Sequence, residues 1–151
     1  MIIIANGSPV LISYFFSHRP SLAIDFGYKL KDKQPVFGHT KTWRGLITSI
    51  SVTSLAGFII GYPLITGCII ASFSMLGDLI SSFIKRRLNT APSSKAMLLD
   101  QLPESFIPAI GISYFIPLTM LNIAIIVCGF FFIELFLSKI LFKFGIRKQP
   151  Y

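Results

Sequence analysis

Two long apolar runs limit how this chain can fold more than any other feature of the sequence. Leu46–Ile80 is interrupted by Gly61-Tyr62-Pro63, and Ser105–Leu137 contains Pro117 near its middle. The hydrocarbon core of a bilayer is about 30 Å thick, so one spanning helix needs roughly 17–25 residues. Each run is therefore too long for one span and fits two, which turn at Gly61–Pro63 and near Pro117 to Asn122.

The composition agrees with a membrane protein. Hydrophobic residues make up 53% of the 151 residues, charged residues make up 13%, and the mean hydropathy is +0.72. A soluble domain typically carries about 25% charged residues, so this chain has too few to cover an aqueous surface. Helices satisfy every backbone amide internally in lipid. We therefore expect an all-α integral membrane protein with a single transmembrane domain.

Five transmembrane helices are predicted. The N-terminal run Met1–Phe16 is apolar and carries no basic residue, which favours a short first span over a cleaved signal peptide. The predicted spans are residues 1–16, 46–62, 63–83, 104–118 and 120–138, separated by polar loops at 17–45 and 84–103 and followed by a basic tail at 139–151.

The positive charges support this topology. All 14 Lys and Arg residues lie in the two polar loops and the tail, and neither predicted turn holds any. Five spans put these three segments on one side, which the positive-inside bias makes cytoplasmic. In a bacterial cell this would be the inner membrane. The net charge of +8 does not indicate nucleic-acid binding, because the basic residues separate apolar runs that hold most of the aromatic residues.

The end of the predicted third span carries a candidate site. Asp78, Ser82 and Lys85 fall at i, i+4 and i+7, which is one face of a helix, and Arg86 follows directly. An acid within an apolar span is costly and usually marks function. The alternative is a structural ion pair of Asp78 with Lys85 or with a neighbouring helix.

Two further acids, Asp100 and Glu104, precede or begin the fourth span on the same membrane side as Asp78. Hard oxygen ligands among Lys and Arg suit Mg²⁺ bound through the phosphates of a nucleotide. The simpler alternative is that acids are favoured at a helix N-terminus by the helix dipole. Glu134, in the last apolar run, is expected to pair with Lys139 at the interface.

The first polar loop contains a candidate phosphate-binding segment. Gly38 allows a tight turn, Lys41 and Arg44 lie close enough in sequence to converge on one anion, and Thr42 supplies a hydroxyl. The alternative is a solvated basic loop with Trp43 as an interfacial anchor.

These motifs in combination resemble the CDP-archaeol synthase family. Gly77-Asp78-Leu79, Ser82 and Lys85-Arg86, followed by Leu99-Asp100, resemble the signature of cytidylyltransferases that make CDP-lipids. Phe37-Gly38 and Lys41-Thr42-Trp43-Arg44-Gly45, together with Asn6 and Pro9, are similar to the archaeol branch. The resemblance extends over nearly the whole chain.

The resemblance implies a Mg²⁺-dependent enzyme of five spans with a cytoplasmic site, in which a lipid phosphate attacks the α-phosphorus of CTP and pyrophosphate leaves. It implies that the metal ligands are Asp78 and Asp100, with Glu104 as a further candidate, and that Lys85 acts with both aspartates in catalysis. The implied phosphate contacts come from Lys41, Arg44, Lys85 and Arg86, and the hydroxyls from Thr42 and Ser82.

The chain departs from the archaeal pattern at two positions. His39 stands where an acid is common, and Pro103 stands where a second Asp is common, so that Glu104 comes one residue later. This variant resembles bacterial members of the family. Two alternatives stay open: a non-catalytic membrane protein whose basic loops bind anionic lipid head groups, and a degenerate relative that binds a lipid phosphate without turnover.

Overall fold

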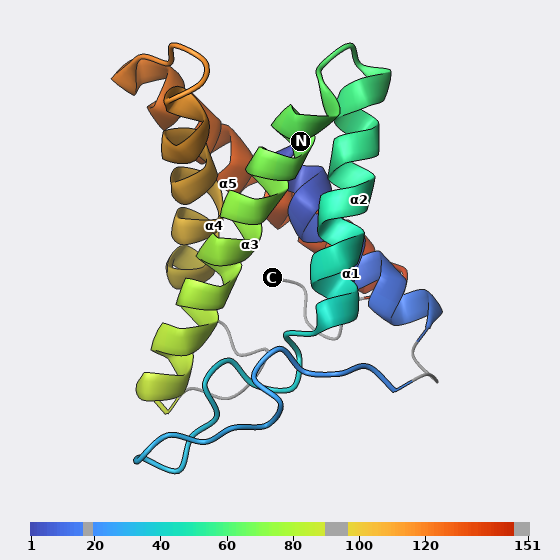
Figure 1. The fold of residues 1–151 in the computed structure, drawn as a ribbon, viewed down its shortest axis with the longest axis vertical. Helices are drawn as coiled ribbons and strands as arrows, with labels where there is room; N and C mark the ends of the chain where they lie inside the picture. The colour runs from blue at the N-terminus through green and yellow to red at the C-terminus, as the bar shows by residue number, and fades with distance from the viewer. Residues whose placement is uncertain (17–19, 90–96, 147–151) are drawn as a thin grey trace.

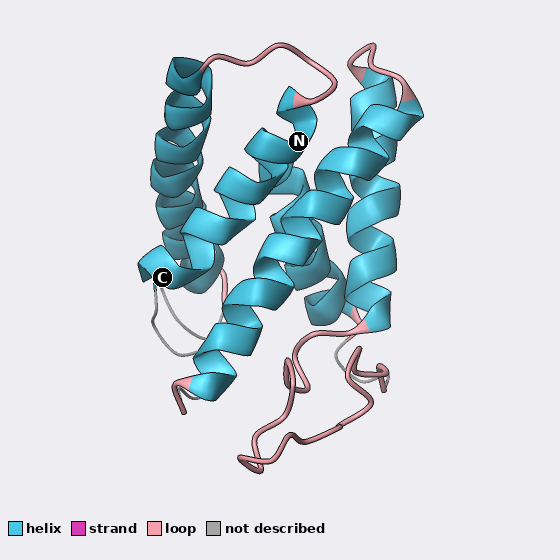
Figure 2. Cartoon of the chain, turned by 60° about the vertical axis from the view of Figure 1, so that its left-hand side comes forward, coloured by secondary structure: helices cyan, strands magenta, loops and turns pink. Residues whose placement is uncertain are grey.

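The structure is a computed structural model that describes residues 1–16, 20–89 and 97–146. Figure 2 shows that the regular secondary structure of these residues is helical, apart from isolated bridges between Ala23 and Thr42 and between Lys29 and Pro35. The helices are α1 (Ile2–Phe15), α2 (Trp43–Ile59), α3 (Leu64–Arg87), α4 (Met97–Ser113) and α5 (Met120–Lys143). The expected all-helical fold is therefore confirmed.

Helix α3 lies at the centre of the bundle. It packs extensively on α2 and α4, while α1 packs on α2 and α5 packs mainly on α4. The turns that join α2 to α3 and α4 to α5 lie at one end of the bundle, and the long segment 20–42 lies at the other end (Figure 1). The segment 20–42 therefore lies at the same end as the start of α2 and the end of α3.

The outer surface of the bundle is apolar. Helices α3 and α5, with mean hydropathies of 1.7 and 2.4, are long and apolar enough to cross a membrane, and α1 is a shorter apolar helix. Large hydrophobic side chains are exposed on the outside, including those of Phe58, Ile59, Phe132 and Phe136. An apolar surface of this extent is typical of a bundle that faces lipid rather than water.

The interior is built from small residues. Ser49, Thr53, Ser74 and Ser81 are fully buried. Small side chains allow the backbones of membrane helices to approach closely, whereas large apolar side chains gain little by leaving lipid. A Cβ added at Gly67 of α3 would lie 2.4 Å from a backbone atom of α2, so this contact requires glycine.

The helices continue beyond the predicted spans on the side of segment 20–42. Helix α3 runs past residue 83 to Arg87, α4 begins at Met97 before the predicted start at 104, and α5 ends at Lys143 rather than 138. Basic residues in the last turn of a helix are favoured by the helix dipole, which accounts for the extension of α3 through Lys85–Arg87. Hydropathy predicts only where a run of apolar residues ends, whereas the helix itself continues into the polar residues that follow or precede that run. The spans themselves stay predictions, and part of the predicted loop 84–103 lies outside the described residues.

Candidate functional site

An ion pair joins segment 20–42 to the centre of the bundle. The Lys41 Nζ atom lies 2.5 and 2.6 Å from the two carboxylate oxygens of Asp78 on α3. The two side chains are 23% and 20% exposed, so the pair is largely shielded from solvent. Burial lowers the pKa of Lys41, but the facing carboxylates of Asp78 and Glu104 outweigh it and hold the pKa above its ordinary value. Lys41 therefore places a fixed positive charge at the site.

A second ion pair links α3 to α4. The Lys85 Nζ atom donates to Asp100 Oδ2 at 2.8 Å, and the two side chains are 10% and 31% exposed. Lys85 shares a helix face with Asp78, as its spacing predicts, but its partner is Asp100 and not Asp78. Each of these two acids is thus held by a lysine from a different part of the chain.

Glu104 completes the acidic group. Its carboxyl group lies close enough to that of Asp78 for the two to interact. Because α4 begins at Met97, Asp100 and Glu104 are one helical turn apart and share the face that packs on α3. Pro103 stands where a second Asp is common in the archaeal pattern. Glu104 comes one residue later and still lies on the same helix face as Asp100.

Gly77 brings the two acidic helices together. A Cβ added at Gly77 would lie 2.3 Å from the Pro103 carbonyl oxygen and 3.0 Å from Glu104 Cα. The Ser74 hydroxyl also donates to the Glu104 carbonyl oxygen at 3.3 Å. Only glycine permits this approach, which places Glu104 beside Asp78. In the sequence Gly77 is recognisable only as part of the Gly77-Asp78-Leu79 motif, and its position next to an acid in an apolar run is the signal for this close approach.

Arg86 lies directly under the turn at Gly38. Its side chain is 5% exposed, and a Cβ added at Gly38 would lie 3.9 Å from both Cδ and Nε of Arg86. Gly38 has a φ of +95°, which favours glycine. The Arg86 Nε atom has no hydrogen-bond partner among the described residues. A buried guanidinium with an unused donor is well suited to receive an anion.

Asp25 organises the turn that covers Arg86. Its carboxylate accepts hydrogen bonds from the backbone N–H groups of Gly38 at 2.8 Å, Phe37 at 2.9 Å and Gly27 at 3.0 Å. Burial alone raises the pKa of Asp25, but these three N–H groups hold it below its ordinary value. This role of Asp25 was not predicted; the signal for it in the sequence is the spacing of Asp25 and Gly27, which is typical of an Asx turn.

Arg87 fastens the same segment to the end of α3. Its Nη1 atom lies 2.6 Å from Asp32 Oδ2, and its Nη2 atom donates to the Pro35 carbonyl oxygen at 2.6 Å. The guanidinium carbon also lies 5.2 Å from the centroid of the Phe83 ring. Segment 20–42 is therefore attached to α3 by Arg87 as well as by Lys41.

The other predicted site residues have separate positions. The Thr42 hydroxyl oxygen caps α2 by accepting from the Gly45 N–H at 3.2 Å, which leaves its own proton available. Arg44 Nη1 lies 3.5 Å from the Phe16 carbonyl oxygen at the end of α1. Ser82 is 4% exposed within α3, and His39 is exposed. The structure thus gathers Lys41, Lys85 and the three acids, and it gives Thr42 and Arg44 local structural contacts.

The acidic group is compatible with a nucleotide-bound Mg²⁺ ion. Among the residues that the structure describes, no set of three or more His, Cys, Asp or Glu side chains is arranged as a complete metal site. Mg²⁺ usually takes only one or two carboxylates and completes its shell with phosphate oxygens and water. Asp78 and Glu104 lie beside each other where α3 and α4 approach at Gly77, so the two carboxyl groups fit this chemistry.

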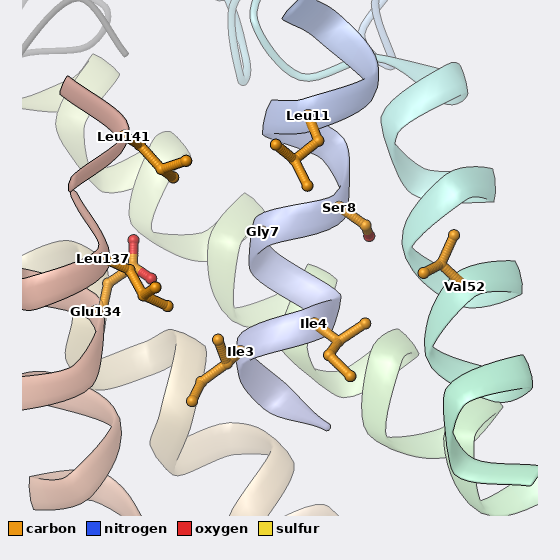
Figure 3. A pocket seen from close by; sticks show the side chains of 9 residues that line it. All are labelled: Ile3, Ile4, Gly7, Ser8, Leu11, Val52, Glu134, Leu137 and Leu141. Carbon is orange, nitrogen blue, oxygen red and sulfur yellow. The ribbon is translucent and has the colours of Figure 1, made fainter. Parts of the chain in front are cut away.

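Glu134 is buried on the face of α5 that is turned toward α1. Its side chain is 7% exposed on α5, whereas Lys139 is exposed. Figure 3 shows Glu134 in a groove between α5 and α1, across from Ile3. The structure thus turns the Glu134 side chain toward α1, and its pairing with Lys139 at the membrane interface stays a prediction.

Known proteins with similar sequences have been described as lipid-synthesis enzymes. The family model for CarS-like CDP-archaeol synthase matches residues 5–151. The CDP-archaeol synthase of Pyrococcus furiosus is 41% identical over 107 residues, which cover 64% of this chain and 60% of that protein. The CDP-archaeol synthase of Staphylothermus marinus is 32% identical over 159 aligned positions, which cover 97% of this chain and 85% of that protein.

A solved structure has the same fold. It belongs to an intramembrane enzyme for the biosynthesis of archaeal membrane lipids, and it matches with a TM-score of 0.70 and 26% identity. The match covers 90% of this chain and 91% of that chain. Together with the apolar helices, this match identifies the chain as an all-helical integral membrane protein. The family predicted from the motifs is confirmed: this chain belongs to the CarS-like CDP-archaeol synthase family.

Proposed function

We propose that this protein transfers a cytidylyl group from CTP to a lipid phosphate and releases pyrophosphate. The observation that carries the proposal is the cluster of Asp78, Asp100 and Glu104 with Lys41 and Lys85, at the end of an apolar bundle where segment 20–42 lies. Phosphoryl transfer depends mainly on positioning and on neutralising charge, and this cluster supplies both. Family membership supports the same reaction.

The acids form the proposed metal site. Asp78, Asp100 and Glu104 would hold Mg²⁺, which when bound neutralises part of the triphosphate charge and aligns its oxygens. Lys41 pairs with Asp78 and Lys85 pairs with Asp100, so each of these partly buried acids has a charged partner. When CTP binds, Lys41 and Lys85 turn to its phosphates, and the cluster exchanges one set of ion pairs for another.

The remaining contacts orient the substrates. Arg86, with its unused donor, binds a phosphate of CTP or of the lipid, and the hydroxyls of Ser82 and Thr42 donate to phosphate oxygens, as does Arg44. An oxygen of the lipid phosphate then forms a bond to the α-phosphorus of CTP. The bond from that phosphorus to the bridging oxygen breaks, and pyrophosphate leaves with the electron pair.

The proposed topology places the site in the cytoplasm. Five helices would span the membrane, with segment 20–42, the end of α3 and the C-terminal tail on the cytoplasmic side, where CTP is present. The basic residues at this end support the proposal through the positive-inside bias. Accessibility of single cysteines at Lys31 and Tyr62 to a membrane-impermeant thiol reagent would test it, because the two positions should react from opposite sides.

The nucleotide can be tested by thermal unfolding of the purified protein in detergent. A ligand that binds the native state raises the apparent melting temperature, so CTP with Mg²⁺ should raise it and ATP with Mg²⁺ should raise it less. Pyrophosphate release with a lipid phosphate should then depend on CTP. Equal shifts with both nucleotides would contradict CTP selectivity, and no shift at millimolar nucleotide would favour a protein that only binds lipid head groups.

A further inference from the structure

Asp25 is a buried acid that does not belong to the charged cluster of the proposed site. It is 8% exposed. Its carboxylate accepts from the N–H of Gly27 in its own turn and from the N–H groups of Phe37 and Gly38, twelve and thirteen positions later. Within the described residues its hydrogen-bond partners are these backbone groups and not a Lys or Arg side chain. Asp25 therefore holds backbone in place rather than a charge.

The backbone that Asp25 holds is the turn beside two cations. The Lys41 N–H donates to the Gly38 carbonyl oxygen at 3.1 Å, which closes the turn. A Cβ at Gly38 would lie 3.9 Å from both Cδ and Nε of Arg86, so the turn packs directly on that side chain. The turn thus covers Arg86 and leads at once into Lys41, the partner of Asp78.

Arg86 keeps its charge for another partner. Its Nε atom has no hydrogen-bond partner among the described residues. Burial lowers the pKa of the guanidinium, and the charge that opposes this comes from Asp100. Because the Asp25 carboxylate accepts from the N–H groups of the turn, it fixes the cover of Arg86 without binding its donor. The guanidinium stays available to an anion.

We propose that Asp25 is a positioning residue for the proposed reaction: it holds the Gly38 turn on Arg86, so that the guanidinium meets a phosphate in a fixed and shielded position. The inference rests on the proposed function and deepens it. Asp25 does not touch the phosphate and acts through the turn. Donors that are already in place need no rearrangement when the charged substrate arrives. The phosphate belongs either to CTP or to the lipid, and binding of each is measured separately.

The sign of the effect separates positioning from simple charge. Removal of a carboxylate near an anion site reduces repulsion, so charge alone predicts tighter phosphate binding in Asp25→Asn. The amide nitrogen of Asn is a donor and cannot accept from an N–H group, so at least one of the three hydrogen bonds is lost and the turn is released. Positioning therefore predicts weaker binding.

Calorimetric titration of the whole protein in detergent measures this sign, with CTP plus Mg²⁺ and with dihexanoyl phosphatidic acid as separate ligands. Asp25→Asn should raise the Kd of one of them by roughly ten-fold or more, as expected when a hydrogen bond to a charged group is lost. Asp32→Asn is the matched control, because Asp32 accepts from the Gln34 N–H at 3.1 Å in the same local way but is 42% exposed. Its Kd values should equal those of the wild type. Unchanged or lower Kd values for both ligands in Asp25→Asn would overturn the inference.

Two further variants test whether Asp25 acts through the turn and Arg86. In an Arg86→Gln background, Asp25→Asn should change the same Kd by less than about two-fold, because changes that act through one group are not additive. Gly38→Ala keeps every charge but places a side chain at a φ of +95°, so it should weaken the same ligand even if Asp25→Asn does not fold. Additive effects in the cycle, or a wild-type Kd in Gly38→Ala, would overturn the inference.

Steady-state kinetics separate positioning from loss of folded protein and from failure of the proposed reaction. A smaller folded fraction lowers the apparent kcat and leaves both KM values unchanged, whereas a misplaced Arg86 raises the KM of the ligand identified by calorimetry. If the wild type binds that ligand but releases no pyrophosphate, the proposed function fails and the Kd values still decide. A weaker Kd in Asp25→Asn would then retain the positioning role, and an equal Kd would overturn it.

Discussion

The contact between α3 and α4 and the contact between α1 and α5 are built in opposite ways. Helices α3 and α4 approach so closely that Gly77 has no space for a methyl group, and ion pairs and hydrogen bonds cross between them. Helices α1 and α5 barely touch, and Gly7 faces open space. The first contact holds charged groups in fixed positions, and the second leaves an apolar groove of about 280 Å³.

This difference corresponds to where the proposed site lies. A triphosphate and a lipid phosphate need charges held in place, because a group displaced by even an ångström loses much of its catalytic value. The groove between α1 and α5 contains neither the lysines nor the aspartates of the proposed site, so its helices are not required to hold them in place. The close contact of α3 with α4 at Gly77 meets this requirement, whereas the open contact of α1 with α5 is not subject to it.

The largest expected effect is loss of activity when the charges of the close contact are changed. Asp78→Asn and Asp100→Asn should each lower CTP-dependent pyrophosphate release by roughly a hundred-fold or more, because each removes a proposed metal ligand and the partner of a lysine. Asp32→Asn is the matched control, since Asp32 is an acid of segment 20–42 outside the cluster. Full activity of both cluster variants with Mg²⁺ would show that the metal assignment is wrong.

A large effect on stability is expected when the close contact is forced apart. Gly77→Val should lower the free energy of unfolding by about 1–3 kcal/mol or more, because its Cβ would meet the backbone of Pro103, which cannot yield as a flexible side chain does. Gly129→Val is the control, because a Cβ there meets nothing within 4 Å. Thermal unfolding in detergent measures both variants, and the same melting temperature for the two would refute the close packing of α3 on α4.

A moderate effect on the pH dependence of stability is expected from Asp25, which organises the turn over Arg86. Because the folded-state pKa of Asp25 is lowered, its carboxylate contributes stability above its unfolded-state pKa of about 3.9 and loses it as the pH falls through the folded-state pKa. The melting temperature of the wild type should therefore fall more steeply below about pH 4 than that of Asp25→Asn. Parallel curves for the two proteins over this range would mean that Asp25 does not carry this dependence.

The smallest effect is expected at the solvent-facing attachment of segment 20–42. Asp32 is 42% exposed, so a double-mutant cycle of Arg87→Ala and Asp32→Ala should give a coupling of only about 0.2–1 kcal/mol. The coupling should decrease at high salt, because exposed charges are screened. A coupling of several kcal/mol would contradict this expectation. It would mean that the exposed Arg87–Asp32 pair is as strong as the shielded Lys41–Asp78 pair.

Much of the fold and the composition of the site followed from local pattern. Apolar run lengths predicted the helices, and Asp78 with Lys85 was recognised as one helix face because a helical period is a local property. The end of each helix was less well predicted, as α4 shows by starting at Met97, because polar residues near the interface are compatible with either helix or loop. The number of spans and the roles of the site residues stay predictions.

The sequence alone determined that this chain forms a bundle of apolar helices with basic connections, and its motifs identified the family. Only the tertiary structure decided that Lys41 pairs with Asp78 across 37 positions, that Lys85 pairs with Asp100, and that Glu134 faces a groove. Periodicity specifies which residues share a helix face, whereas the partner of that face depends on how closely two helices pack. In this protein glycines set that distance: Gly77 lets α4 approach α3, and Gly7 leaves the groove beside α5 open.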